Sequence, residues 1–147
     1  ADVRRLVDTR ATWIAPMTNV WGFSHSMRVE LGRDPNRDFP YLQQPRSCMT
    51  TQTARTVNEL YRRHLFQFMI TFHGGERSLT YEWGSKNHMA RRKSTESPDD
   101  HAFTKVGKAI QEATLEGSFM GHHYPVGRIT DVVYPVDGGM EDWSYAA

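Results

Sequence analysis

The chain has 147 residues, of which 38% are hydrophobic and 24% charged, and this length suits one domain with a buried core. Its formal net charge of +1 gives no general attraction to nucleic acid or to acidic membranes, so no nucleic-acid partner is expected. No apolar run approaches the roughly 18 residues that a membrane-spanning helix needs, which excludes a membrane span.

For the first part of the chain, the sequence predicts short regular elements on either side of one long loop. Residues 3–7 are amphipathic, and residues 11–17 are rich in β-formers, which predicts a buried strand that Pro16 ends. Residues 18–47 are rich in Gly, Pro, Asn and Asp and predict a long loop, which the aromatic residues within it keep ordered. Residues 49–66 have helical spacing of apolar positions and predict an amphipathic helix.

The second part alternates strands and helices. Buried strands are expected at 68–72 and 78–83, and a β-like run at 129–134. Residues 85–100 are polar and charged and predict a flexible surface insertion. A helix follows it, running to about Leu115 and ending near Gly117. Alternating strands and helices predict an α/β layered fold with a largely parallel or mixed sheet.

His73 stands at the end of a predicted hydrophobic strand and is followed by two glycines. The carboxyl edge of a sheet is where α/β proteins place ligands, and imidazole is the commonest metal-binding side chain. The alternative is a histidine that only caps the strand through a backbone hydrogen bond. His73 and Glu76 also have a spacing that could chelate a metal, whereas the neighbours His122 and His123 would point to opposite faces of a strand.

The loop at residues 34–40 contains Asn36 and Arg37, whose side chains could clamp a carboxylate. The alternative is a surface turn in which Arg37 pairs with Asp34 or Asp38. Arg28 lies in the same loop region and could stabilise a developing oxyanion, or it could be an ordinary exposed arginine.

Tyr145 ends the stretch GGMEDWSY at residues 138–145, a Gly-Gly turn followed by aromatic residues. A tyrosine on such a loop could close over a bound ligand. The alternative is an aromatic side chain that packs on the body of the domain beside Trp143.

Four stretches, in the same order along the chain, resemble the zinc metallocarboxypeptidases of the funnelin type. They are residues 14–23 (IAPMTNVWGF), residues 34–40 (DPNRDFP), residues 71–75 (TFHGG) with 81–84 (YEWG), and residues 124–145, which resemble the substrate-capping loop. The resemblance implies a three-layer domain with a mixed, largely parallel sheet and helices on both faces. Residues 1–147 would form part of this catalytic domain.

The resemblance also implies a role for each candidate residue. His73 would be the last of three protein zinc ligands, and Glu76 would be only its neighbour. Asn36 and Arg37 would hold the terminal carboxylate of a peptide substrate. Arg28 would polarise the scissile carbonyl, with nearby Arg33 as the alternative for this role, and Tyr145 would cap the terminal residue of the substrate.

The family pattern implies parts that this chain does not contain. The first two zinc ligands are expected before Ala1 and the catalytic glutamate after Tyr145, so they would come from the remaining segments of the domain or from another chain. The implied function is zinc-dependent removal of C-terminal amino acids from peptides or proteins by metal-activated water, in a secreted or vesicular protein. The alternatives are a non-catalytic module that binds peptide C-termini or acidic tails, and an amidohydrolase of the same fold.

Overall fold

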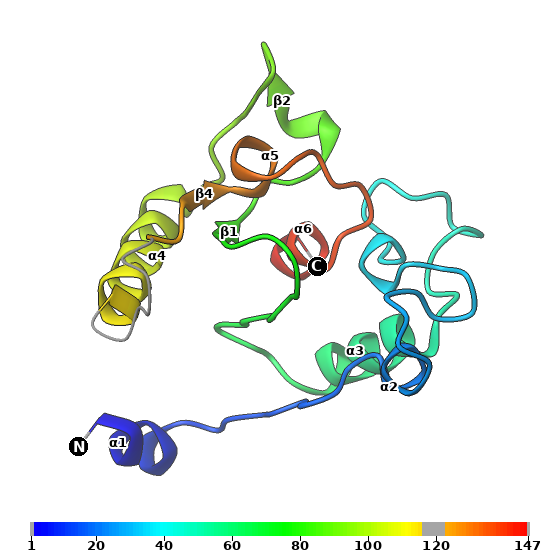
Figure 1. Ribbon diagram of the computed structural model, residues 1–147, viewed down its shortest axis with the longest axis horizontal. Coiled ribbons are helices and arrows are strands. Elements are labelled where there is room, and N and C mark those ends of the chain that lie inside the picture. Colours follow the sequence, from blue (N-terminus) through cyan, green and yellow to red (C-terminus); the bar gives the residue numbers. More distant parts are fainter. Residues whose placement is uncertain (1, 116–122, 147) are drawn as a thin grey trace.

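The computed structural model describes residues 2–115 and 123–146 (Figure 1). The described helices are α1 (Asp2–Thr9), α2 (Val20–Ser24), η1 (Pro35–Arg37), α3 (Gln52–Arg63), η2 (Lys86–His88), α4 (Asp100–Leu115), α5 (Ile129–Val132) and α6 (Met140–Ala146). The described strands are β1 (Leu79–Tyr81), β2 (Met89–Ala90), β3 (Lys93–Ser94) and β4 (Val126–Arg128). None of the described helices is long and apolar enough to cross a membrane.

The centre of the α/β arrangement is a parallel pair of strands, β1 and β4. Leu79 lies opposite Val126, and Tyr81 lies opposite Arg128. Helices α4 and α5 pack on this pair. The Tyr81 ring stacks on Phe103 of α4 with centroids 5.5 Å apart, which joins the helix to the sheet. The predicted strand at 78–83 and the predicted helix up to Leu115 are therefore confirmed, while the end near Gly117 lies outside the described residues.

The β-like run at 129–134 is not a strand, so that prediction is wrong. The strand lies just before it, at β4, and residues 129–132 form the short helix α5. The hydroxyl of Thr130 donates to the Gly84 carbonyl at 2.7 Å, and the Val136 amide donates to the same oxygen at 2.8 Å. These contacts from across the fold outweigh the β-preference of Ile129, Thr130 and Val132.

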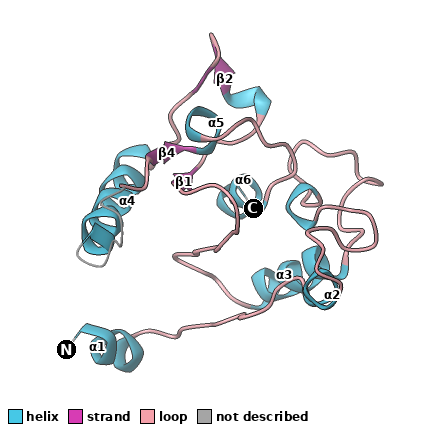
Figure 2. Cartoon of the chain, in the orientation of Figure 1, coloured by secondary structure: helices cyan, strands magenta, loops and turns pink. Residues whose placement is uncertain are grey.

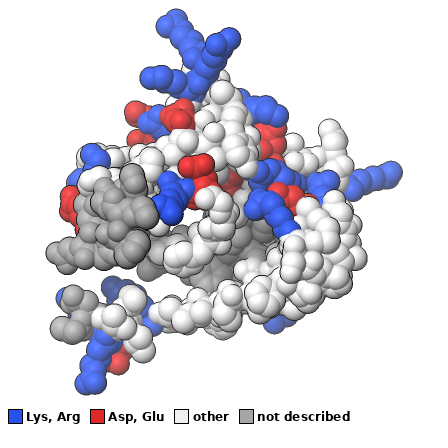
Figure 3. Space-filling model, in the orientation of Figure 1, with Lys and Arg blue, Asp and Glu red and all other residues white. Residues whose placement is uncertain are grey.

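Residues 85–100 contain defined elements rather than one irregular insertion. Helix η2 leads into a hairpin of β2 and β3, in which Met89 pairs with Ser94. Arg91 and Arg92 form its turn, with φ angles of 51° and 69°. Figure 3 shows arginine and lysine side chains standing out over this hairpin. The predicted mobility of the segment stays a prediction.

Two segments predicted as strands, 11–17 and 68–72, are extended but carry no strand pairing (Figure 2). Their apolar side chains face solvent, with Ile14 82% and Phe72 93% exposed. A strand needs a neighbour to satisfy its backbone N–H and C=O groups. No described segment pairs with either, so the sheet is that of an incomplete α/β domain.

The hydrophobic core joins α3, α6 and the loop before α3. It consists of Phe39, Ala54, Val57 and Trp143, all at most 7% exposed. The rings of Phe39 and Trp143 lie 4.9 Å apart, and Tyr61 packs against the same indole at 4.9 Å. The candidate loop at residues 34–40 is therefore anchored directly on the core.

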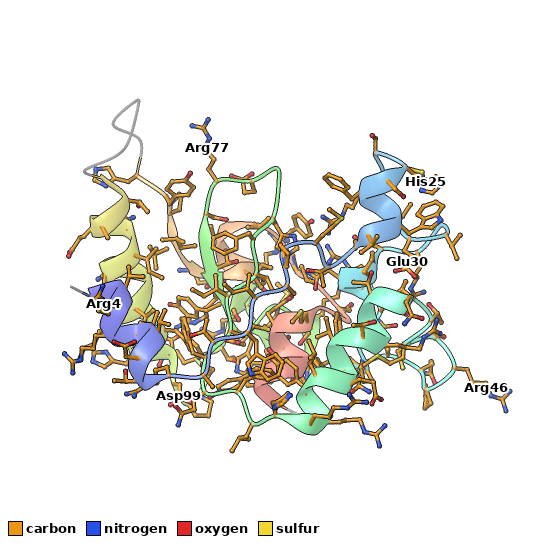
Figure 4. All side chains as sticks on the ribbon, turned by 90° about the horizontal axis from the view of Figure 1, so that it is seen from below. Arg4, His25, Glu30, Arg46, Arg77 and Asp99 are labelled. Carbon is orange, nitrogen blue, oxygen red and sulfur yellow. The ribbon has the colours of Figure 1, made fainter. Side chains whose placement is uncertain are left out.

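Two buried carboxylates fix the N-terminus of α3, which confirms the core of the helix predicted at 49–66. Glu30 accepts hydrogen bonds from the Gln52 and Thr53 amides at 2.5 and 3.0 Å, and it lies beside α3 in Figure 4. Asp38 accepts from the Thr51 amide at 2.7 Å and from its hydroxyl at 2.8 Å. Burial alone would raise the pKa of both carboxyl groups, but these hydrogen bonds lower it overall.

Candidate active site

The candidate site is built around η1, whose start is fixed by an aspartate cap. Oδ1 of Asp34 accepts a hydrogen bond from the Asn36 amide at 2.9 Å, and Pro35 occupies the first helical position. This turn carries Asn36 and Arg37 next to each other. Oδ1 of Asn36 accepts from the Met140 amide at 2.9 Å, so the turn is tied to the first residue of α6.

The Gly-Gly turn before α6 packs closely on this loop. The Phe39 amide donates to the Gly138 carbonyl at 3.1 Å. Gly138 has a φ of +70°, and a Cβ there would lie 2.9 Å from the Arg37 carbonyl oxygen. Only glycine suits this backbone conformation and this close approach. The glycines thus bring the start of α6 against the loop at 34–40, and the segment predicted as a loop at 138–145 is a Gly-Gly turn followed by a helix.

Arg37 does not form the surface ion pair that the sequence left open. Its Nη1 donates to the Asn36 carbonyl at 2.6 Å, and its Nη2 donates to the Tyr134 hydroxyl at 3.2 Å. Its guanidinium carbon lies 5.8 Å from the centre of the Tyr134 ring, within the range of a cation–π contact. Within residues 2–115 and 123–146, no salt bridge joins Arg37 to a carboxylate.

The two neighbouring aspartates pair with other arginines. Nε of Arg28 lies 2.9 Å from Oδ2 of Asp34, and the Arg28 side chain is 51% exposed. Nε of Arg33 lies 3.5 Å from the fully buried Asp38, and its Nη2 donates to the Ser47 carbonyl. Arg33 thus holds buried structure together, whereas Arg28 presents its guanidinium to the open surface.

His73 follows an extended segment rather than a strand, and the charged groups of the site act on its ring. The residue as a whole is exposed to solvent. Neighbouring atoms still shield part of its ring, and this desolvation lowers the pKa of His73. Arg28 lowers it further, Asp34 raises it and Arg37 lowers it. A lowered pKa keeps the imidazole neutral at neutral pH, which is the form that binds a metal.

The described residues do not form a zinc site by themselves. No group of three or more histidine, cysteine or carboxylate side chains is placed to hold a metal ion in the part of the chain that the structure describes. A catalytic zinc needs three protein ligands. His73 could supply one of them, so a zinc site would need ligands from beyond the described residues.

Tyr145 packs away from the other candidate residues. Its hydroxyl donates to Oδ2 of Asp99 at 2.9 Å. Its ring meets Trp83 edge-on at 5.2 Å and Phe103 at 5.7 Å, rather than the Trp143 partner considered above. The role of Tyr145 as a cap over the substrate stays a prediction.

Tyr134 is the residue of this neighbourhood that the sequence interpretation missed. It is 52% exposed and touches Arg37, 97 residues away in sequence. The sequence predicts Tyr134 as part of a strand at 129–134, and this pattern gives it no functional role. The available signal was its place four residues before Gly138, on the approach to the Gly-Gly turn.

Several acidic side chains are buried in α6 and in the segment around Gly84. Asp142 is 1% exposed and accepts hydrogen bonds from the Gly84 and Ser85 amides, both at 2.8 Å. Burial raises the pKa of Glu82 to about 7, and the Asp142 and Glu141 carboxylates raise it as well. Oε2 of Glu82 and Oε1 of Glu141 are buried and have no hydrogen-bond partner among the described residues.

Glu141 connects these acids to the loop at 34–40. Burial and the neighbouring Asp142 raise its pKa, whereas Arg37 and Asn36 lower it. The positive Arg37 and the acids of α6 therefore belong to one electrostatic neighbourhood.

The sequence matches a family model over its whole length. The model described as "Zinc carboxypeptidase" matches residues 1–147. The chain is 25% identical to carboxypeptidase D of Rattus norvegicus over 98% of its own length, and to a zinc carboxypeptidase of Simulium vittatum over 97%. It spans 12% of the rat protein and 54% of the Simulium protein.

A solved structure has the same fold. It is that of bovine thrombin-activatable fibrinolysis inhibitor in complex with tick carboxypeptidase inhibitor, with a TM-score of 0.70 at 17% sequence identity. The superposition covers 89% of this chain and 52% of the bovine chain. The described fold is thus about half of a carboxypeptidase-like α/β domain.

Proposed function

Because the chain belongs to the zinc carboxypeptidase family, we propose that the whole protein is a zinc-dependent exopeptidase that removes amino acids from peptide or protein C-termini. The observation that carries this proposal is the arrangement of Asn36 and Arg37. Both side chains sit on a capped turn that a hydrogen bond ties to α6, and Arg37 pairs with no described carboxylate.

This pair is suited to hold the terminal carboxylate of a substrate. The guanidinium of Arg37 is a planar fork that matches a carboxylate, and its present partners are two neutral groups, the Asn36 carbonyl and the Tyr134 hydroxyl. The Met140 amide donates to Oδ1 of Asn36 and so fixes the orientation of this side chain. A carboxylate at this point would receive donors from both side chains.

Arg28 is proposed to stabilise the oxyanion that develops at the scissile carbonyl. Its side chain is half exposed, and its charge acts on the His73 ring together with that of Arg37. Arg33 is less suited to this role because it is engaged with Asp38 and with the Ser47 carbonyl.

His73 is proposed to be one ligand of the zinc ion. The other ligands would belong to the remaining segments of the domain or to another chain, since the described residues do not complete a site. The neutral state favoured by the lowered pKa of His73 suits this role.

Arg37→Ala tests the clamp. Losing a charge-assisted pair with the terminal carboxylate should cost about 1.5–3 kcal/mol, which is roughly 10- to 150-fold in kcat/KM. The measurement is the cleavage of peptides with a free C-terminal carboxylate by the whole, zinc-loaded protein. Cleavage is measured again after a chelator has removed the zinc and after zinc has been added back. Arg62→Ala, an exposed arginine of α3, is the matched control and should leave kcat/KM unchanged.

Each outcome of this experiment has a distinct meaning. Unchanged cleavage by Arg37→Ala would refute the clamp. If chelation left cleavage intact, the zinc-dependent function would be wrong. Binding of C-terminal peptides without cleavage would support the alternative of a non-catalytic binding module.

Tyr134→Ala and Tyr145→Ala together test which tyrosine covers the substrate. Tyr134 touches Arg37, so we expect its loss to raise KM about 2- to 10-fold, the value of one neutral hydrogen bond or cation–π contact. If Tyr145 caps the terminal residue of the substrate, Tyr145→Ala should raise KM as well, although its hydroxyl donates to Asp99 in this structure. A larger rise in KM for Tyr145→Ala than for Tyr134→Ala would identify Tyr145 as the capping residue, and an unchanged KM would refute that role.

A further inference from the structure

The carboxylate of Asp34 joins the two halves of the candidate site. Its Oδ1 accepts from the Asn36 amide at 2.9 Å, and its Oδ2 accepts from Nε of Arg28 at 2.9 Å. We propose that Asp34 is a positioning residue that sets the orientation of the Arg28 guanidinium relative to the Asn36–Arg37 clamp. The inference rests on the proposed function, because the orientation of Arg28 matters only if this side chain stabilises the oxyanion of the reaction.

The way in which Asp34 contacts Arg28 indicates that it orients the guanidinium rather than only neutralising its charge. Asp34 contacts Arg28 through Nε alone, whereas an arginine that only pairs with a carboxylate can use two parallel bonds. The Nη1 and Nη2 atoms of Arg28 make no hydrogen bond to any described residue. Asp34 thus holds the guanidinium of Arg28 at Nε, while Nη1 and Nη2 remain available to an oxygen of the substrate.

A second hydrogen bond fixes the backbone of Arg28. Nδ2 of Asn19 donates to the Arg28 carbonyl at 2.8 Å. The Asn19 side chain is itself fixed, since its Oδ1 accepts from the Gly22 amide at 2.8 Å and caps α2. Arg28 is therefore anchored at its main chain by α2 and at its side chain by the capped turn of η1.

The exposure of the pair argues against a mainly stabilising role. The Arg28 side chain is 51% exposed and that of Asp34 22% exposed, so solvent screens their attraction. Exposed ion pairs contribute little to stability. The consequence of this contact is geometric: one carboxylate relates Arg28 to the turn that carries Asn36.

Asp34→Asn separates positioning from capping. An asparagine keeps an Oδ1 that can accept from the Asn36 amide, but its amide nitrogen cannot accept from Nε of Arg28. In the whole, zinc-loaded protein we expect kcat for peptide cleavage to fall about 10- to 100-fold, the scale expected when a catalytic group is misplaced by up to 1 Å. KM should stay within about twofold because the clamp keeps its cap.

Two further variants make the test specific. In an Arg28→Ala background, Asp34→Asn should change kcat by less than about twofold, since it would have no guanidinium left to orient. Glu59→Gln is the matched control: it removes another exposed arginine–carboxylate contact, to Arg62 at 3.0 Å on α3, and should leave kcat unchanged. An unchanged kcat in Asp34→Asn, or an equal loss in the Arg28→Ala background, would overturn the proposal.

A structural readout keeps the inference separate from the proposed function. The Nε–H proton of Arg28, followed by NMR, should exchange slowly in the wild-type protein and faster in Asp34→Asn. If the wild type cleaves no peptide, the proposed function fails, and this signal alone decides whether Asp34 holds Arg28. Equal exchange in both proteins would overturn the positioning role whatever the activity.

Discussion

His73→Ala is expected to lower both the zinc affinity and the peptide-cleaving activity of the whole protein by more than about 100-fold. Losing a residue that merely supports a metal ligand already costs 10- to 100-fold, and a direct ligand should cost more. The expectation follows from the neutral imidazole that the lowered pKa of His73 favours at neutral pH. Zinc content by elemental analysis and kcat/KM for a peptide substrate are the two measurements.

His101→Ala is the matched control for this variant. His101 is an exposed histidine of α4, so its loss should change neither zinc content nor activity. If His73→Ala kept one zinc per protein at wild-type affinity, His73 would not be a ligand. If zinc stayed bound and only activity fell, the role of His73 would lie in the reaction rather than in holding the metal.

Local signals in the sequence were enough to predict the two longest described helices, α3 and α4. Thr51 caps α3 through its hydroxyl, which accepts from the Ala54 amide at 3.1 Å, and apolar residues recur on one face of the helix. Asp100 is the first residue of α4, and an acidic residue in the first turn favours the start of a helix. Caps and helical periodicity lie within a few residues of the element that they define, so a single sequence contains them.

Strands were harder to predict because pairing depends on distant segments. β1 forms because β4, 47 residues further on, lies beside it, as in the register of Leu79 with Val126. The segment at 68–72 is more apolar than β1 but has no described partner and stays unpaired. Residues 129–132 show the reverse case, in which tertiary hydrogen bonds turn β-forming residues into a helix.

The candidate site was predictable in its residue types but not in its contacts. The motif at 34–40 and the Gly-Gly turn identified Asn36 and Arg37 through the family resemblance, and the structure ties this turn to α6. Contacts across the fold, such as Arg37 with Tyr134 or Asn36 with Met140, join residues about 100 positions apart. No local pattern contains such pairs, which is why Tyr134 was missed.

Trp143→Ala should destabilise the chain by about 3–5 kcal/mol, the usual cost of removing a large buried aromatic side chain. Trp143 is 7% exposed and packs against Phe39 and Tyr61, so it joins α6 to α3 and to the loop that carries the clamp. Urea unfolding measures the change in the free energy of unfolding. Leu65→Ala is the control: Leu65 is 98% exposed, and its loss should cost less than about 0.5 kcal/mol.

The same measurement in the whole protein tests whether the exposed apolar segments belong to a larger sheet. Phe72 is 93% exposed here, so Phe72→Ala should be nearly neutral in the isolated chain. If further strands of a carboxypeptidase-like domain cover the segment at 68–72, the same substitution should cost about 3–5 kcal/mol in the whole protein. Trp143→Ala should cost the same in both, because its partners all lie within this chain. An equally small cost of Phe72→Ala in both proteins would mean that this segment is surface in the complete domain as well.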